Sequence, residues 1–523
     1  GKPIHNPGQD GAGAQSLAEE GDIDTLVSWM HHLPASTDPS RIDLQINLAW
    51  ALAHYFRFDE SRQLLDNLDQ MVVNHRDDIT PNAWLKLRVV RAICEAFAEK
   101  IPESLAIVEP LLAKVPCGDT WVDGLICNIL SYCHVVNQRY SDALEVQRHM
   151  PCPESPLDNL FVSVYRAFII TQCHLGQGDL ENAWGHAENA LRQAERYTGP
   201  QSTSGATLAP LLAEMAYERM NLDSLNTLLA DRLEFIDRFG PPDALSRCYT
   251  YLARQALNDD MPHEAERLLE HAQRLAVSRG WQRPQALLLA EQARVRLQRA
   301  NYPGAEQLHR QLEQLAARAT IDAENPCQRA IAQHANVSRS RLLLASGQAP
   351  QASLLLGELV TEQERRGDRL SAARLRTLWS LSLWNSGENA AAVAALQPVL
   401  QLAAQQHLKR IFLDAGDALQ PLLVRVRETS AASEGDDPWP GKGSLSEGKR
   451  IEHENLDVNQ ELSERELQIL QLIADGQMNK EIARSLTIST ETVKWHIKNI
   501  YAKLKVNSRT QAMSRALEMK LLD

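Results

Sequence analysis

Apolar positions between residues 16 and 427 recur with the spacing of helices, in a unit that repeats along the chain. Each unit has an apolar helix, a short polar or glycine-bearing turn, and a second helix that opens with a small residue. Paired helices of this kind bury the apolar stripe of one pair against the next pair. The residue just inside the second helix recurs every 39 to 47 positions, at Ser61, Ser104, Ala143, Ala183, Leu225, Ala265, Ala305, Ala352 and Ala392.

The turn between the paired helices is written G-x-x-x-x-A at 178–183, 347–352 and 387–392. The unit resembles tetratricopeptide repeats, although their period is shorter, at about 34 residues, and armadillo or HEAT pairs share the longer one. We favour a tetratricopeptide-like superhelix because of this turn. Such solenoids have extended concave faces that bind partners, and the alternative is that the region is only a spacer.

The rest of the chain divides by composition. Residues 1–15 are rich in Gly, Pro, Asn and Gln and are predicted to be disordered. Residues 428–460 have no apolar period and many Ser, Gly, Pro and charged residues, which predicts a flexible linker. Residues 461–523 regain helical periodicity. We therefore predict a sensor or interaction domain over 16–427 and a separate domain over 461–523.

The overall composition favours an all-α protein. Hydrophobic residues make up 44% and aromatic residues only 5%, and β-branched runs are scarce. The chain has neither an apolar run long enough to span a membrane nor a signal peptide, so we expect a cytoplasmic location. Its eight cysteines contain no C-x-x-C pair, so we interpret them as buried free thiols rather than disulfides or metal ligands.

Charge is distributed unevenly along the chain. The net charge of the whole chain is −13, yet residues 478–515 carry a net charge of +6. A short basic unit on an acidic body indicates an interaction module. Its eight cations are Lys480, Arg484, Lys494, Lys498, Lys503, Lys505, Arg509 and Arg515, against Glu481 and Glu491.

Capping residues predict four helices in residues 461–523. Ser463 and Glu466 form a capping box for the first helix, which ends at Gly476. Asn479 caps the second helix and Ser489 the third. The fourth helix is capped by Ser508, with Gln511 three residues later. Two short helices joined by a tight turn, the second of them basic, form a helix-turn-helix, which places its second helix in the DNA major groove.

The third helix contains the stretch TVKWHIKNI, in which Trp495 lies between cations. At 100° per residue, one side of the helix is apolar and predicted to be buried, and consists of Val493, Ile497, Ile500 and Leu504. Trp495 and Ala502 fall almost opposite this stripe. They are flanked there by Lys494, Lys498, Asn499 and Lys505.

The C-terminal segment resembles the LuxR-type helix-turn-helix over roughly 60 residues. The matching strings are R-E-x-x-x-L, N-K-E-I-A, I-S-x-x-T-V-K-x-H-x-x-N-I, K-L-x-V and R-T-Q-A. The resemblance implies that Lys494, Trp495 and Lys498 face the DNA groove, the same face that the helical wheel exposes. The indole of Trp495 would cover a thymine methyl or pack along a sugar edge; the alternative is that it packs against a second subunit.

The remaining candidate DNA contacts are hydroxyls and cations that suit phosphate oxygens, which position a protein without specifying sequence. They are Lys480, Ser489, Thr490, Thr492, Lys503, Arg509 and Thr510. Glu491 could accept a hydrogen bond from a cytosine amine, but we favour a role in balancing the helix dipole. His496 has no second ligand at helical spacing, so we expect a structural histidine rather than a metal ligand.

The N-terminal stretch is similar to a segment of MalT-like regulators. The pattern is G-D-x-x-x-L-x-x-W-x-x-x-L-P, formed by Gly21, Asp22, Leu26, Trp29, Leu33 and Pro34. The resemblance implies an ATPase part before the repeats. The chain begins at Gly1 and has no phosphate loop, since GSLSEGKR at 443–450 ends in Arg where a hydroxyl is required. We therefore expect the ATPase part to lie upstream, and neither a cofactor nor catalysis in this chain.

Together these patterns predict a transcriptional regulator. An effector, either a small molecule or a protein, is expected on the concave face of the repeats, where it would control the binding of double-stranded DNA. Self-association is expected on DNA, with Ala512, Ala516 and Met519 as a candidate dimer contact or simply core. RNA polymerase is a possible partner, and only the resemblance favours activation. The alternative function is an interaction scaffold tethered to DNA.

Overall fold

The computed structural model describes residues 41–75, 79–150, 159–319, 325–430 and 462–521, the last range with gaps at 463, 487–492, 494–495, 498–499, 502, 505, 507–508 and 520. These residues are predominantly helical and none of them lies in a strand. The all-α fold class predicted from the sequence is therefore confirmed.

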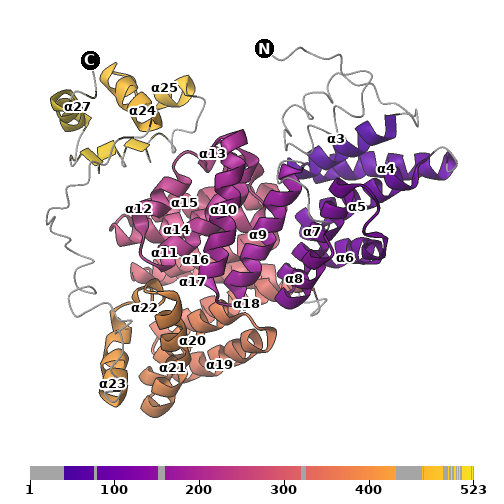
Figure 1. Cartoon of the computed structure of the whole chain (residues 1–523). Helices are drawn as coiled ribbons and strands as arrows, with labels where there is room; N and C mark the ends of the chain where they lie inside the picture. Colours follow the sequence, from indigo (N-terminus) through magenta and orange to yellow (C-terminus); the bar gives the residue numbers. More distant parts are fainter. Residues whose placement is uncertain are drawn as a thin grey trace.

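The described residues between 41 and 430 form nine helical hairpins in succession, and Figure 1 labels their helices. Their first helices are α3 (Ile42–His54), α5 (Pro81–Phe97), α7 (Thr120–Val136), α9 (Leu160–Gly176), α11 (Thr203–Glu218), α14 (Pro242–Asn258), α16 (Gln282–Gln298), α18 (Pro326–Ala345) and α20 (Arg369–Asn385). Their second helices are α4 (Phe58–Asn74), α6 (Ile101–Val108), α8 (Tyr140–Arg148), α10 (Leu180–Thr198), α12 (Leu222–Leu229), α15 (Pro262–Ser278), α17 (Tyr302–Ala319), α19 (Ala349–Arg366) and α21 (Asn389–Gln406).

Shorter elements extend or follow these hairpins. A 3₁₀ turn, η2 (Glu109–Lys114), continues α6, and α13 (Leu233–Phe239) follows α12. After the last hairpin come α22 (Arg410–Leu413), η3 (Asp417–Leu419) and α23 (Gln420–Ser430). The array therefore reaches Ser430, three residues into the segment that the sequence assigned to the linker.

Each of the nine aligned positions is the fourth residue of its second helix and is fully buried, and eight of the nine residues are small, the exception being Leu225. At this position the second helix crosses the first, so a small side chain lets the two backbones approach. Where the residue is serine, its hydroxyl also donates a hydrogen bond to the first helix, from Ser61 to Ala49 O at 2.9 Å and from Ser104 to Ala92 O at 2.8 Å. The predicted register of the repeats is confirmed.

All nine hairpins share one turn geometry, although only three of them carry the glycine motif. Five residues before each aligned position the chain adopts a positive φ, between 54° and 84°. The next residue donates a backbone hydrogen bond to a carbonyl five residues back, as in a Schellman motif. Gly178, Gly347 and Gly387 adopt this conformation without a Cβ penalty. The other six turns use Phe56, Glu99, Gln138, Met220, Asp260 and Ala300.

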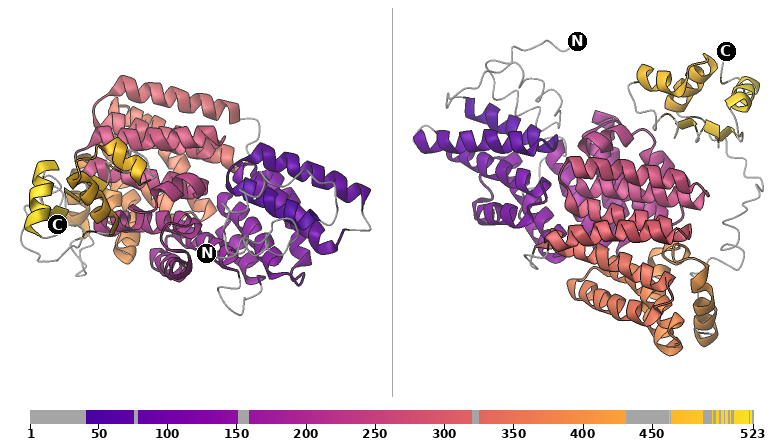
Figure 2. Two further views of the ribbon diagram at one scale, coloured as in Figure 1. Left: turned by 90° about the horizontal axis from the view of Figure 1, so that it is seen from above. Right: turned by 180° about the vertical axis from the view of Figure 1, so that it is seen from behind.

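The array curls until distant hairpins touch one another (Figures 1 and 2). Gln138, in the α7–α8 turn, donates hydrogen bonds to Gln363 at 2.6 Å and to Asp368 at 2.9 Å, in the α19–α20 region. The Tyr140 hydroxyl also reaches Asp368, at 3.0 Å. Trp281 Nε1 donates to the Phe97 carbonyl at 2.7 Å. Contacts between residues more than 180 positions apart therefore fix the curvature.

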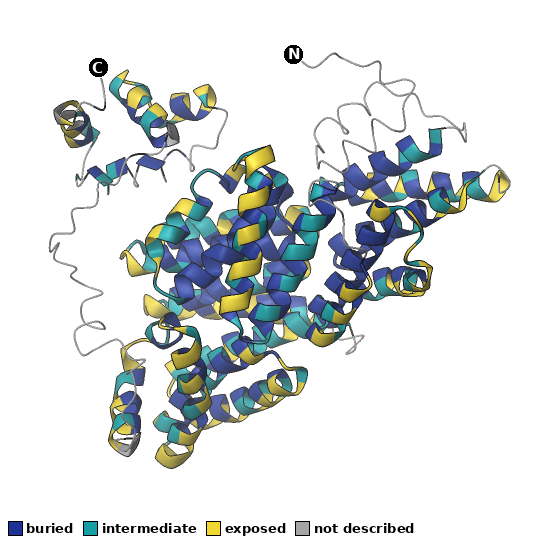
Figure 3. Ribbon diagram, in the orientation of Figure 1, coloured by how far each residue is buried: buried dark blue, intermediate teal, exposed yellow. Residues whose placement is uncertain are grey.

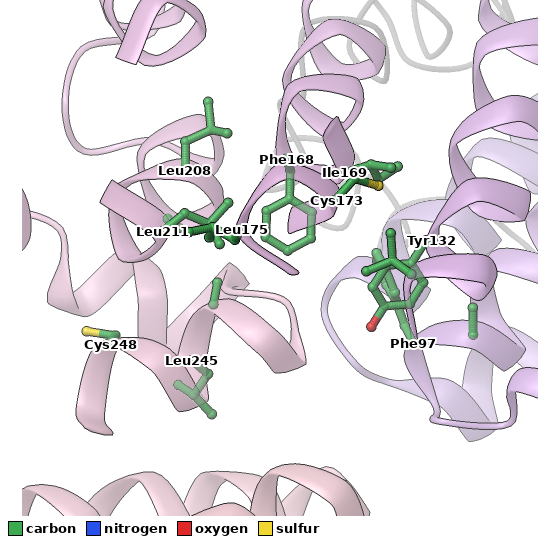
Figure 4. Packing of buried hydrophobic residues seen from close by; sticks show 14 of the residues in the cluster. Phe97, Tyr132, Phe168, Ile169, Cys173, Leu175, Leu208, Leu211, Leu245 and Cys248 are labelled. Atoms are coloured by element: carbon green, nitrogen blue, oxygen red, sulfur yellow. The ribbon is translucent and has the colours of Figure 1, made fainter. Parts of the chain in front are cut away.

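The hairpins bury the helix faces that they turn toward one another (Figure 3), and most of these buried residues are apolar. In Figure 4, Phe168 and Leu175 of α9 face Leu208 and Leu211 of α11. Six of the seven cysteines within the described ranges are buried, and none of the seven forms a disulfide. Burial raises the pKa of the Cys133 thiol to about 12, so this thiol stays protonated at neutral pH.

No helix among the described residues is both long and apolar enough to cross a bilayer. The predicted boundaries of the segment 1–15, and the linker between 431 and 460, lie outside the described residues.

Candidate functional site

The C-terminal module is built around its own apolar core. Its described helices are α24 (Glu464–Ala474), α25 (Asn479–Ser485) and α27 (Arg509–Glu518), and the described positions between 493 and 504 are helical as well. The predicted stripe of Val493, Ile497, Ile500 and Leu504 is buried and packs in a cluster with α24, α25 and α27. The buried side of the third helix is thereby confirmed, whereas Lys494, Trp495, Lys498, Asn499, Ala502 and Lys505 of the opposite side lie outside the described residues.

The first two helices of this module end and begin close to the predicted positions. Gly476 has a φ of +82°, as expected for the residue that ends α24. The second helix begins one residue earlier than predicted, since Asn479 is its first residue and Met478 its N-cap. The reason is Glu481, whose carboxylate accepts a hydrogen bond from Met478 N at 2.6 Å. The caps predicted at Ser463, Ser489 and Ser508 lie outside the described residues.

Most of the predicted DNA contacts lie in the undescribed part of the third helix and the turn before it. Ser489, Thr490, Thr492, Lys494, Trp495 and Lys498 fall there, as does Glu491. The side chain of Thr510 is not described either, although its backbone is helical. Lys480 is exposed on α25, as a phosphate contact requires. His496 is buried, in agreement with the predicted structural role.

Lys503 and Arg509 both make contacts within the module. Lys503 Nζ donates a hydrogen bond to Glu466 Oε2 at 2.6 Å, and this carboxylate is almost fully buried. Arg509 Nη2 donates to the carbonyls of Ile473 at 3.1 Å and Gln477 at 2.7 Å, at the end of α24. Both cations therefore hold α24 in place, and their contacts with phosphates remain predictions.

The fourth helix contributes mainly to the core. Ala512 and Ala516 are fully buried in the cluster of the module. Met519, by contrast, is 47% exposed, and its neighbour Leu517 is 56% exposed. Of the two interpretations left open for this side of α27, core packing therefore applies to both alanines, and a dimer contact could only involve the exposed end.

The repeat array encloses a cavity on its concave side. The first helices of the hairpins line it, from α7 and α9 through α11, α14, α16, α18 and α20. One chamber has a volume of about 270 Å³ and a second one about 190 Å³. Both chambers are bordered by Arg254, Leu287, Gln333, His334, Ser371 and Arg374. The structure thus provides a concave site of the kind predicted for the effector.

Charged side chains from distant hairpins pair across this cavity. Arg374 of α20 binds Glu214 at 2.8 Å and Glu218 at 2.7 Å, both on α11. Arg254 of α14 binds Glu291 of α16 at 2.8 Å. Burial opposes ionisation of Glu291, but Arg254 and Arg294 outweigh this effect and hold its pKa well below the usual range. The wall of the cavity is therefore rich in fixed charges.

A second group of pairs lies toward the larger chamber. Arg283 of α16 binds Asp243 at 2.6 Å and Glu99 at 2.8 Å. Within the described ranges, no cluster of three or more His, Cys, Asp and Glu side chains is placed to hold a metal ion. Ion pairs between distant hairpins therefore also border the larger chamber.

The sequence patterns did not identify this cavity. Its charged residues come from hairpins that only the curvature of the array brings together. One signal was present, since Glu214 and Glu291 interrupt otherwise apolar helical segments, LAPLLAEMAYE and ALLLAEQA. A carboxylate in such a segment is buried and needs a partner.

The fold and the C-terminal module define a class of protein, a helical-repeat array joined to a DNA-binding helix-turn-helix. Residues 86–429 match the family described as "MalT-like TPR region", and residues 460–516 match "Bacterial regulatory proteins, luxR family". The chain belongs to the MalT-like TPR family and carries a luxR-family regulatory module at its C-terminus.

Relatives of known function are transcriptional regulators. The chain is 20% identical over 512 residues to the HTH-type transcriptional regulator AlkS of Alcanivorax borkumensis, covering 95% of this chain and 56% of that protein. It is 21% identical over 535 residues to the regulator MalT of Serratia proteamaculans, covering 97% and 57%. The chain therefore spans a little over half the length of these relatives.

The two parts of the chain also have separate relatives. Over 84 residues the chain is 46% identical to the transcriptional regulatory protein LiaR of Bacillus subtilis, covering 16% of this chain and 40% of that protein. Among solved structures, Rap protein complexed with Competence and Sporulation Factor has a TM-score of 0.51 at 12% identity, covering 71% of this chain and 99% of that one. This likeness concerns the fold of the array.

Proposed function

We propose that this chain is the sensing and DNA-binding part of a transcriptional regulator, and that an effector in the cavity of the array controls its occupancy of DNA. One observation carries the proposal: a single chain joins a helical array around a charged cavity to a luxR-family module. The Rap protein, which has a similar fold, is described in a complex with Competence and Sporulation Factor. That complex supports the proposal that an array of this fold binds a partner.

In the module, the third helix would read bases from the side opposite its buried stripe. Lys494, Trp495 and Lys498 are assigned to base edges, and the exposed Lys480 to a phosphate. A lone module that neutralises few phosphates binds weakly at physiological salt. We therefore propose that copies of the chain associate on adjacent sites, which raises the effective concentration of each module.

The proposed output is activation, through contact with RNA polymerase at the promoter, and the proposed place of action is the cytoplasm. AlkS and MalT are regulators, but this chain covers only 56% and 57% of their lengths. The parts of those proteins outside the match could therefore contribute to the output as well.

Selection of bound sequences from a random DNA library, followed by fluorescence anisotropy with the full chain, tests the proposal. Lys498→Ala should reduce discrimination between the selected and a scrambled site about 5- to 150-fold, because one base contact contributes about 1–3 kcal/mol. Lys480→Met is the matched control, and it should weaken binding to both sites equally. If Lys498→Ala bound every sequence as tightly as the parent, the assigned groove face would be wrong.

A further inference from the structure

Helix α18 presents one face to the smaller chamber of the cavity. His334, Val337 and Arg341 line this chamber, and their spacing of three and four residues places them on the same side of the helix. His334 and Arg341 are two turns apart, about 10 Å along the axis. The chamber measures about 190 Å³. A single water needs only about 10–15 Å³, so the chamber has room for a small organic molecule.

The carboxylates around this chamber already have cationic partners. Glu291 is bound by Arg254 at 2.8 Å and by Arg294 at 2.9 Å. Asp414 lies 3.5 Å from Arg254, and Glu218 is bound by Arg374 at 2.7 Å. Each of these anions is therefore occupied by an arginine other than Arg341.

Of the four arginines that line this chamber, Arg341 is the one that forms no hydrogen bond or ion pair with the described residues. Burial lowers the pKa of its guanidinium to about 10, despite the opposing charge of Glu291. The group thus remains protonated at neutral pH, and the nearby charges of Glu291 and Asp414 offset its burial only in part, because Arg294 and Arg254 act against them. A partly buried cation without a partner is unfavourable, and a bound anion would relieve this.

A second donor faces the same space. Arg294 also lines the chamber, and its Nη2 nitrogen is buried without a hydrogen-bond partner among the described residues. His334 is held neutral at pH 7, since burial lowers its pKa to about 4. A neutral imidazole offers one hydrogen-bond donor and one acceptor, so His334 can bind a polar group of a ligand but adds no positive charge to the chamber.

The remaining wall of the chamber is apolar. It is formed by side chains of four helices, α16, α18, α20 and α22, and of the segment that follows α22. These side chains include Leu287, Val337, Leu375, Leu378 and Ile411. An inorganic anion would leave this surface uncovered. A ligand that satisfies both parts of the wall needs an acidic head and an apolar body.

We infer that this chamber binds a small organic acid, with its carboxylate between Arg341 and Arg294 and its apolar part against Val337, Leu375 and Ile411. The inference rests on the proposed function, because it assigns a chemical class to the proposed effector. Carboxylates pair well with guanidinium groups, whose planar donors form two parallel hydrogen bonds.

Calorimetry and thermal melting of the full chain test the inference with two matched pairs of probes. Hexanoate and benzoate are the acids, and hexanamide and benzamide are their uncharged counterparts. The acids should bind the parent and raise its Tm, and Arg341→Gln should weaken that binding about tenfold or more, since a hydrogen bond to a charged group contributes about 1.5–3 kcal/mol. Without ligand, Arg341→Gln should melt no lower than the parent because Arg341 has no bond to lose.

Arg339→Gln is the control variant, since Arg339 lies on the same helix but is exposed. It should bind the acids as the parent does. The inference is overturned if neither acid binds, if the amides bind as tightly as the acids, or if Arg341→Gln and the parent bind the acids equally. It is also overturned if inorganic phosphate competes fully with the acids at equal concentration, because the apolar wall would then contribute nothing.

DNA binding by the same preparations separates this inference from the proposed function. If the chain binds its selected DNA sequence but no acid, the inference alone fails. If it binds acids with the expected dependence on Arg341 but reads no DNA sequence, the proposed function fails and the acid site stands.

Discussion

Replacing Lys503 should destabilise the C-terminal module by leaving a buried carboxylate without its partner. Lys503 Nζ lies 2.6 Å from Glu466 Oε2, and the side chains are 30% and 4% exposed. Exposed ion pairs contribute about 0.2–1 kcal/mol, whereas breaking a buried pair costs about 3–5 kcal/mol. Because Lys503 is partly exposed and Glu466 is buried, we expect Lys503→Met to lower the free energy of unfolding of the module by about 1–3 kcal/mol.

Amide hydrogen exchange of the full chain can measure this loss locally, because the C-terminal module has its own apolar core and we expect it to open separately from the array. A loss of about 1–3 kcal/mol corresponds to exchange about 5 to 150 times faster. The double variant Lys503→Met with Glu466→Gln should recover most of the protection, since it no longer buries an unpaired charge. Lys480→Met, which removes an exposed cation, should leave the exchange of α24 unchanged.

The same variants separate the two roles of Lys503. If Lys503 also contacts a phosphate, then Lys503→Met and the double variant should both reduce the slope of log affinity against log salt by about 0.9, evenly for all DNA sequences. If α24 exchanged at the parental rate in Lys503→Met, the reasoning from the Glu466 contact would be refuted. An unchanged salt slope would assign Lys503 to the fold alone.

Three further predictions concern other parts of the chain. Acidification from pH 6.5 to 4 should destabilise the array by about 3 kcal/mol through His54 alone. Burial lowers the pKa of His54 in the folded state to about 4, so the unfolded chain takes up the proton first as the pH falls. Urea unfolding at several pH values checks this, and His54→Leu should show a weaker dependence of stability on pH. Ala392→Leu should lower the free energy of unfolding by about 1–3 kcal/mol, because Ala392 is fully buried where two helices cross. The same substitution at its exposed neighbour, Ala391→Leu, should change that free energy by less than about 0.5 kcal/mol. Thermal melts of both variants check this. Trp495→Ala should weaken specific DNA binding more than non-specific binding in anisotropy titrations, and equal losses would mean that the ring only supports the fold.

Features that depend on local spacing could be predicted from the sequence. The small residues at the helix crossings were found because a period of about 40 residues repeats the same steric requirement in each hairpin. The buried stripe of the third module helix was found for a similar reason, since Val493, Ile497, Ile500 and Leu504 fall on one side of any α-helix. In both cases the residue type and its position on the helix were enough to predict that the side chain is buried.

Turn geometry could be predicted only in part. Glycine marks a positive φ in three of the nine turns, but Phe56, Met220 and Ala300 adopt the same conformation in others. In those turns the Schellman hydrogen bonds and the packing of the hairpin hold a residue in a conformation that it would rarely adopt alone. The sequence motif therefore identified the residue type that tolerates the geometry, and not every place where the geometry occurs.

The cavity could not be predicted, because its walls are made of partners far apart in the chain. Arg374 lies 160 residues from Glu214, and Arg283 lies 184 residues from Glu99. No repeating pattern in the sequence marks either pair, because the two partners meet only through the curvature of the whole array. A small change in the angle between hairpins would place other side chains opposite each other.

The same curvature links the cavity to the end of the array that leads to the DNA-binding module. Ile411 and Asp414 line the smaller chamber, and α22, to which Ile411 belongs, lies between α21 and α23. The Tyr217 hydroxyl of α11 donates to Asp414 at 2.8 Å, and Lys409 N donates to the Glu218 carbonyl at 2.9 Å. A ligand bound in the chamber, as we propose, would therefore contact the segment that leads into α23, the last described helix before residue 431. Regulation then requires only that the ligand favours one arrangement of these contacts, and a preference of about 1–3 kcal/mol would change DNA affinity about 5- to 150-fold.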